Sequence, residues 1–389
     1  MKPFYKIFSS FFSFFINGML AVITANIMQL LINDYNFSYN MISLCIAAQS
    51  FGNLLMVAVS GFIIKKININ NAIYIFMGCF IIGCYSIFTF HHFLFILISM
   101  FITGIGWGLC NNSMHIVINS YNPSLLNILH MSYAAGSFSG PFLLSVFMKY
   151  NMGWKPCIFI IIVLCILLLI FYFFCSRNDN NTIINITDTP TLYNKLNFPE
   201  LFKDRFFIIC LVLYFIYIGF ETIINSWLIP CLTSVNLVNT ISAQNLLSIF
   251  WICVILSRLL NSFITNTISA DKLLFIGSTG SLLTIIFLLY AKNITILYIL
   301  IILSGLFIGI ISPCNAIHAG RYLNGNGIAS GILFAGGGIG SIIFPLIAGP
   351  LAQYTTLRNV VLFMIILLII FAFTALLSCT YNKIYRIEE

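Results

Sequence analysis

The chain has 389 residues, of which 61% are hydrophobic and only 7% are charged, and its formal net charge is +8 at pH 7. A soluble domain of this length needs far more polar surface, so the composition excludes a soluble protein and indicates a polytopic membrane protein. The basic residues form no continuous patch, which argues against a nucleic-acid partner.

Twelve segments are apolar enough to cross a bilayer as helices, since a spanning helix needs about 20 mostly apolar residues. The strict alternation of polar and apolar residues that a transmembrane barrel requires is missing. We therefore expect an all-α polytopic membrane protein with twelve transmembrane helices. The expected spans are 8–31, 41–64, 71–90, 93–117, 127–149, 155–175, 206–232, 240–266, 270–291, 294–317, 326–351 and 358–380.

The basic residues predict how the chain is oriented. With a cytoplasmic N-terminus, most of the 17 Lys and Arg, Arg258 among them, fall on the cytoplasmic side. We therefore expect a multi-pass plasma (inner) membrane protein with both termini cytoplasmic. The first span is too long for a typical signal peptide and is expected to be retained. The exceptions that fall outside are Lys149, Lys155, Lys292 and Arg358.

Polar residues inside the early spans are candidates for binding a solute or an ion. Asn26 lies in the first span, and Asn111, Asn112 and His115 follow a glycine-rich stretch in the fourth. Asn111 and His115 are four residues apart and so share a helix face, which Asn112 adjoins. These side chains would either hydrogen-bond a polyhydroxylated solute or join neighbouring helices. Gly104 and Gly108 would let another backbone approach closely.

The fifth span combines a histidine with a smooth, kinkable segment. His130 is a candidate proton relay, although a histidine at a helix end more often bonds a loop carbonyl. Gly136, Gly140 and Pro141 predict a helix that can rock against a neighbour, so this segment is expected to move during function.

A polar break from Ser176 to Arg205 divides the spans six and six. The expected domains are an N-terminal bundle over 1–175, a cytoplasmic linker over 176–205 and a C-terminal bundle over 206–389. The halves also repeat at one offset, which indicates two pseudo-repeated six-helix bundles. The matching pairs are Gly18 with Gly219, Gly104 with Gly305, Gly108 with Gly309, Tyr121 with Tyr322, and Gly136 with Gly337.

Glu221 is the strongest candidate, because it is an acidic residue inside an apolar span. A charge at the centre of a bilayer costs about 2.5–3.5 kcal/mol on insertion scales, and such residues are usually functional. Tyr217, Glu221 and Asn225 are four residues apart and share one helix face. Glu221 would bind a proton, a cation or a substrate hydroxyl, or would bond a neighbouring helix. Trp227, on another face, would pack, gate or stack on a sugar ring.

The remaining spans add weaker candidates. Asn315, near Pro313 and His318, is a possible cavity residue, and Gly337 belongs to a glycine run that lacks the preceding strand of a dinucleotide-binding loop. The 12 cysteines are scattered without a Cys-x-x-Cys pattern. We therefore expect no disulfide framework, no metal site and no cofactor.

Three patterns in these spans resemble a known family. They are Tyr217-x-Gly219-x-Glu221-(x)5-Trp227, the alternate glycines at 104, 106 and 108, and Asn127-x-x-His130 followed by Gly136-x-x-x-Gly140-Pro141. The chain resembles the major facilitator superfamily, in particular its branch of fucose–proton symporters and sodium-dependent glucose transporter-like proteins. This resemblance implies the major facilitator fold, with a site between the halves.

The chain departs from that branch at its acidic positions. Proton-coupled fucose carriers have an acid in span 1, which is missing here, and another after the span-4 glycines, where Asn111 stands. Glu221 is then the remaining carboxylate for ion coupling. The superfamily's loop signature is degraded between spans 2 and 3. Its second copy, around Arg258 and Asp271-Lys272, is expected to form a cytoplasmic latch.

These observations predict a monomeric secondary transporter in the lipid bilayer. It would move a small organic solute, first of all a sugar or sugar-like metabolite, with a proton or sodium ion as the coupling partner. The alternative is a carrier of the same fold that exports drugs or metabolites, which its many aromatic residues would suit; a non-transporting receptor also remains open. An intramembrane enzyme would need a nucleophile with its base or clustered metal ligands, and the sequence offers neither.

Overall fold

A computed structural model describes residues 2–122, 125–176, 201–234, 237–265, 267–323 and 327–385. Each predicted span corresponds to one long helix, and the four-residue α12 follows α11. The first half contains α1 (Lys2–Tyr35), α2 (Tyr39–Ile67), α3 (Ile69–Thr89), α4 (Phe93–Tyr121), α5 (Leu126–Lys149) and α6 (Lys155–Ser176). The second half contains α8 (Arg205–Ser234), α9 (Thr240–Ile264), α10 (Ala270–Leu288), α11 (Ile294–His318), α12 (Gly320–Leu323), α13 (Gly327–Tyr354) and α14 (Leu357–Tyr385).

Within the described residues, 11 helices are long and apolar enough to cross a membrane. The long helix outside that set is α5, in which His130 and several serines dilute the apolar residues. The expected all-α polytopic architecture is therefore confirmed. Several helices extend beyond their predicted ends, as α1 and α4 do. A helix does not have to stop where the hydrocarbon ends, because backbone bonds within it persist into the interface.

Side chains before several helices explain where these helices begin. Ser38 accepts a hydrogen bond from the backbone N–H of Met41 at 3.2 Å, and Asn293 accepts one from that of Thr295 at 2.8 Å. Each bond satisfies a donor that the first turn of a helix leaves without an internal partner. The polar residues that interrupt the apolar pattern thus also start the next helix.

Contacts divide the chain into two compact units. Unit 1 comprises residues 1–187 and 240–248, and unit 2 comprises residues 188–239 and 249–389. Most of the expected linker, residues 177–200, lies outside the described part of the chain. The domain boundaries at 175 and 206 therefore stay a prediction.

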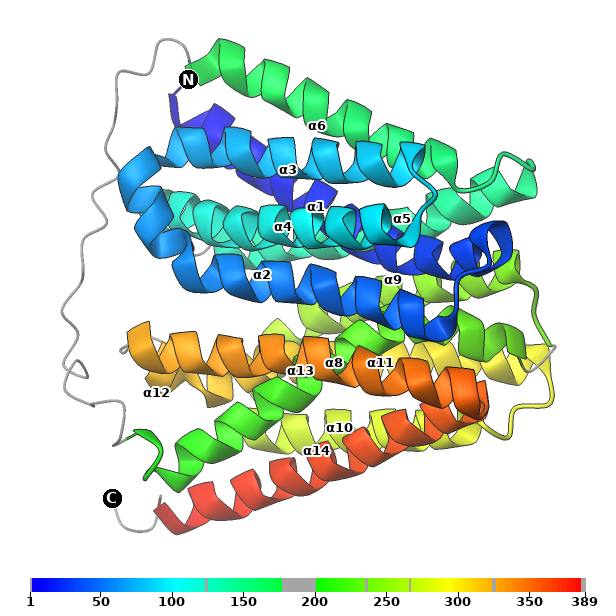
Figure 1. Cartoon of the computed structure of the whole chain (residues 1–389). Helices are drawn as coiled ribbons and strands as arrows, with labels where there is room; N and C mark the ends of the chain where they lie inside the picture. The colour runs from blue at the N-terminus through cyan, green and yellow to red at the C-terminus, as the bar shows by residue number, and fades with distance from the viewer. Residues whose placement is uncertain are drawn as a thin grey trace. The chain divides into compact units, whose positions relative to one another are not determined.

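Glycines allow the helices of unit 1 to pack closely. The helices α2 and α4 lie side by side (Figure 1), as do α1 and α5. A methyl group at Gly104 of α4 would collide with the backbone carbonyl oxygen of Gln49 in α2. One at Gly136 of α5 would collide with that of Phe15 in α1. Likewise, a Cβ added at Gly108 would lie 2.6 Å from the carbonyl oxygen of Asn53 in α2.

Unit 2 repeats this arrangement with the matching glycines. An added Cβ at Gly219 of α8 would lie 2.7 Å from the carbonyl oxygen of Gly340 in α13. At Gly305 of α11 it would lie 2.6 Å from the carbonyl oxygen of Phe250 in α9, and Gly337 faces Ile218. The glycines that coincide at one sequence offset thus occupy equivalent helix contacts in the two units.

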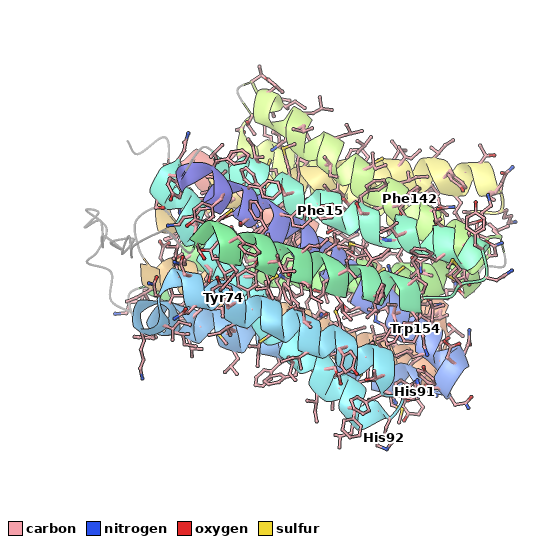
Figure 2. The ribbon with its side chains drawn as sticks, turned by 90° about the horizontal axis from the view of Figure 1, so that it is seen from above. Phe15, Tyr74, His91, His92, Phe142 and Trp154 are labelled. Carbon is pink, nitrogen blue, oxygen red and sulfur yellow. The ribbon has the colours of Figure 1, made fainter. Side chains whose placement is uncertain are left out.

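Polar contacts join the helices of unit 1 near both of its ends. Trp154 donates its Nε1–H to Asp34 at 2.8 Å, and Tyr172 donates its hydroxyl to Asn70 at 2.7 Å. Figure 2 shows Trp154, His91 and His92 toward one end of this unit and Tyr74, which bonds Ser176 at 3.2 Å, toward the other. Each of these pairs is neutral or contains one charged residue, and each holds the ends of two helices together.

Candidate functional site

Glu221 lies near the middle of α8 and faces a cation on the next helix. Its Oε1 is 3.7 Å from Nη2 of Arg258, and the two side chains are 23% and 18% exposed. Arg258 thus pairs with an acid of α8, and its expected role in a cytoplasmic latch stays a prediction. Arg258 lies within the candidate membrane span of α9, on the side that meets α8. Its long side chain can reach the carboxylate, and the two opposite charges offset each other.

Tyr217, one helical turn before Glu221, completes this group. Arg258 donates from Nη2 to the Tyr217 hydroxyl oxygen at 3.4 Å, and the Tyr217 hydroxyl also interacts with Glu221 and with Ser312 of α11. A carboxylate, a guanidinium and a phenol from two helices thus form one polar group, with Ser312 beside it. The 3.7 Å separation is longer than a close charge-assisted hydrogen bond, so the carboxylate can still take another partner.

Asn225 extends the same face of α8 by another turn. Its Oδ1 accepts a hydrogen bond from Trp251 Nε1 of α9 at 3.1 Å. Trp227 lies on a different side of the helix and is only 1% exposed. The structure thus brings Tyr217, Glu221 and Asn225 together on the α9 side of α8, while Trp227 is packed inside.

Asn315 of α11 is a buried amide. It is 1% exposed, and neither of its side-chain polar atoms has a hydrogen-bond partner among the described residues. A buried amide in this condition is costly, so such groups commonly bind water or a ligand. Asn315 lies three residues beyond Ser312, so the two side chains lie on nearly the same side of α11.

His318, expected near a cavity, instead joins three helices at one end of unit 2. Its Nδ1 lies 2.5 Å from Oδ1 of Asp271 in α10, and its Nε2 lies 2.8 Å from Oγ of Ser378 in α14. Phe206 of α8 packs against the imidazole with ring centroids 4.5 Å apart. Asp271, expected in the latch with Arg258, is thus bonded to His318.

Asp271→Ala is expected to destabilise unit 2 by about 2–3 kcal/mol, because it removes a charge-assisted bond to a buried imidazole. The measurement is the thermal stability of the purified protein in detergent. Asn70→Ala is the matched control, since Asn70 holds the corresponding repeat position and makes one neutral bond, worth about 1 kcal/mol. Equal losses from the two substitutions would contradict the stronger role assigned to Asp271.

In unit 1, Asn111 and Asn112 face different helices. Asn17 of α1 donates its Nδ2 to Asn111 Oδ1 at 3.1 Å. Asn112 donates to the Val57 carbonyl oxygen at 3.1 Å and to the Ser60 hydroxyl, so it ties α4 to α2. Both asparagines therefore join helices, Asn111 to α1 and Asn112 to α2, and both side chains remain partly exposed.

The two candidate histidines of unit 1 lie against each other. The rings of His115 in α4 and His130 in α5 have centroids 5.0 Å apart and planes at 81°. Phe14 of α1 contacts both, at 5.6 Å from His115 and 6.1 Å from His130. Asn26 lies elsewhere on α1. It is 1% exposed, and its Nδ2 has no hydrogen-bond partner in the described part of the chain.

The glycine and proline motifs have structural explanations. Gly104, Gly108, Gly136 and Gly337 lie at helix crossings, and an added Cβ at Gly140 would be 2.9 Å from Ile23 Cγ1. Pro141 stands inside α5, directly after this contact. The structure shows why side chains are excluded at these positions, whereas their role in movement stays a prediction.

Sequence reasoning missed three partners of the candidate residues, namely Arg258, Trp251 and Asn17. The signal for Arg258 was present, because a basic residue inside the predicted span 240–266 is the natural partner for an acid in the preceding span. Trp251 and Asn17 had no comparable signal, since an indole or an amide in an apolar helix has many ordinary roles.

Known proteins share both the sequence pattern and the fold. A family model described as Major Facilitator Superfamily matches residues 10–232 and 210–386. "Major facilitator superfamily domain-containing protein 4A" of Xenopus tropicalis is 28% identical over 113 residues, which are 29% of this chain and 22% of that protein. The match therefore spans less than a quarter of that relative's length.

Solved transporter structures resemble the whole chain. A mutant of the nucleoside transporter NupG has a TM-score of 0.76 and 14% identity, over 96% of this chain and 99% of that one. Tetrameric PepTSo2 has a TM-score of 0.73 and 12% identity, over 99% of both chains. At these identities the likeness shows the fold alone, and the family model supplies the relationship. The chain therefore belongs to the Major Facilitator Superfamily and is a multi-span membrane protein of that fold.

Proposed function

We propose that this transporter carries a small, polar, sugar-like solute and couples its movement to a proton or a sodium ion at Glu221. The observation that carries the proposal is the Glu221–Arg258 pair within the candidate spans of unit 2. Two charges in an apolar environment are costly to retain, and such groups in transporters commonly bind ions or substrates.

The geometry supports exchange of partners at the carboxylate. Arg258 and Tyr217 hold Glu221 through contacts of moderate length, and its side chain remains 23% exposed. A proton or cation at Glu221 would replace the attraction of Arg258 and so change the bonds between α8 and α9. Binding at this carboxylate can then shift the balance between two conformations, as alternating access requires.

The sugar-like class of solute follows from the resemblance of the Tyr217-to-Trp227 pattern to sugar carriers. The structural likeness to a transporter of nucleosides, which contain a sugar, agrees with this class at the level of the fold. Our proposal includes two bundles, over 1–175 and 206–389, joined by a cytoplasmic linker. It also includes cytoplasmic termini, a plasma-membrane location and a monomeric carrier.

The test is uptake into proteoliposomes that contain the purified protein, with a pH gradient or a sodium gradient imposed separately. One gradient should drive labelled sugar or nucleoside above its equilibrium level, and an ionophore that collapses this gradient should abolish the excess. Equal internal and external concentrations under both gradients would refute ion coupling. Gradient-driven export of hydrophobic cations without sugar uptake would instead establish the efflux alternative.

A further inference from the structure

One face of α4 carries three side chains that are spaced four residues apart. Trp107, Asn111 and His115 form this face, which we call the α4 row. Each makes a different contact with α1 or α5. Trp107 lies beside Tyr133, with ring centroids 6.5 Å apart and planes 20° from parallel. Asn111 accepts the bond from Asn17, and His115 meets His130.

Each member of the α4 row retains a hydrogen-bonding group that no described residue uses. Asn111 accepts the hydrogen bond from Asn17 through its Oδ1, so its Nδ2–H groups remain available to donate. Likewise, no described residue forms a hydrogen bond with Trp107 Nε1 or with the ring nitrogens of His115. The contacts of these two side chains are between aromatic rings. All three side chains are partly exposed, whereas Cys110 and Met114 between them are buried. Because such a row is unfavourable against lipid, it calls for a polar occupant.

The internal repeat shows that the α4 row is not part of the shared scaffold. The corresponding residues of α11 are Ile308, Ser312 and Ala316, so that only the middle position is polar. The positions of Tyr133 and His130 correspond to Phe334 and Gly331. The glycine contacts recur in both units, but these polar side chains do not. A polar row that one copy keeps and the other lacks points to a specific role.

The charged pair of unit 2 shows the reverse asymmetry. Glu221 corresponds to Leu20, and Arg258 corresponds to Val57. Unit 1 therefore has an uncharged row where unit 2 is mainly apolar, and unit 2 has an ion pair where unit 1 is apolar. The two features are chemically distinct, so they suit different ligands.

We propose that the α4 row binds an uncharged solute in which a flat ring is joined to a hydroxylated ring. This inference rests on the proposed function and narrows its substrate class to nucleosides and aromatic glycosides. The aromatic faces of Trp107 and Tyr133 suit the flat ring. The Asn111 amide and the His115 imidazole can bond hydroxyl groups. The row extends about 12 Å along α4, roughly two helical turns, which suits two linked rings better than one.

Isothermal titration of the purified protein in lipid nanodiscs tests the proposal, with uridine and 4-nitrophenyl β-D-glucoside as probes. At least one of them should bind, and whichever binds tells which two-ring class is accepted. D-glucose, which lacks the flat ring, should bind at least about tenfold more weakly, because it leaves the aromatic pair uncovered. Failure of both two-ring probes to bind, or equal binding of D-glucose, would overturn the proposal.

Two substitutions locate the binding at the α4 row. Asn111→Ala and Trp107→Phe should each raise the Kd of the bound probe, the former by about tenfold, as loss of one or two hydrogen bonds predicts. Asn119→Ala, an exposed asparagine farther along α4, should leave the Kd unchanged. An unchanged Kd in both row variants, with their thermal stability retained, would refute the assignment.

Binding and transport fail separately in this design. Titration needs no ion gradient, so probe binding that is lost in the row variants would stand even if proteoliposomes showed no flux; in that case the proposed transport would be at fault. In the converse case, a solute shows gradient-driven flux while both row substitutions leave its Kd unchanged. That result would support the proposed transport and refute the α4 row as the binding site.

Discussion

Glu221→Gln is expected to abolish ion-driven accumulation, so that the solute reaches an inside-to-outside ratio of about 1, because an ion gradient acts only through differential binding to the carrier. Glutamine retains the size of the side chain but carries no charge. The measurement is accumulation of labelled solute in proteoliposomes under the gradient that drives the wild-type protein. Accumulation at the wild-type level would remove Glu221 from the coupling reaction.

Arg258 separates this coupling role from a purely structural one. Arg258→Gln leaves Glu221 without its cation, which should cost about 3–5 kcal/mol of stability, whereas the double variant with Glu221→Gln should recover much of that loss. If the pair only holds α8 to α9, the double variant should also regain ion-driven accumulation. If Glu221 binds the coupled ion, the double variant should be stable and still uncoupled.

Helical periodicity was enough to predict one face of the candidate site. The four-residue spacing placed Tyr217, Glu221 and Asn225 together, and the structure gives each of them a partner on α9. Spacing along one helix says nothing about the neighbouring helix, so Trp251 stayed unrecognised. Arg258 was not recognised as the partner of Glu221 because counting basic residues to orient the chain treats every arginine as a loop residue, whereas an arginine with a nearby carboxylate can remain within a span.

The internal repeat predicted the helix crossings better than it predicted the polar contacts. Its glycines identify the helix crossings in both units, because close backbone approach imposes the same requirement wherever the fold recurs. Polar side chains are free to differ between the copies once the crossing is kept. His318 illustrates this limit, since its contact with Asp271 joins residues on separate helices that no sequence period relates.

Gly136→Leu is expected to prevent stable folding of unit 1. The Cβ of any side chain at Gly136 would collide with the Phe15 carbonyl oxygen, a backbone atom that cannot rotate away. Overpacking of a well-packed interior typically costs about 1–3 kcal/mol, and a clash with backbone in a helix crossing should cost more. The measurement is the yield of monodisperse protein after extraction, together with its thermal stability.

Gly78 of α3 provides the matched control for this helix contact. An added Cβ there meets nothing within 4 Å, so Gly78→Ala should leave stability unchanged or raise it by about 0.5–1 kcal/mol through better helix propensity. Gly136→Ala should already lower stability, because the first added carbon meets the α1 backbone. If Gly136→Ala and Gly78→Ala behaved alike, α1 and α5 could separate without cost at this crossing. Close packing at the repeated glycines would then not be what holds unit 1 together.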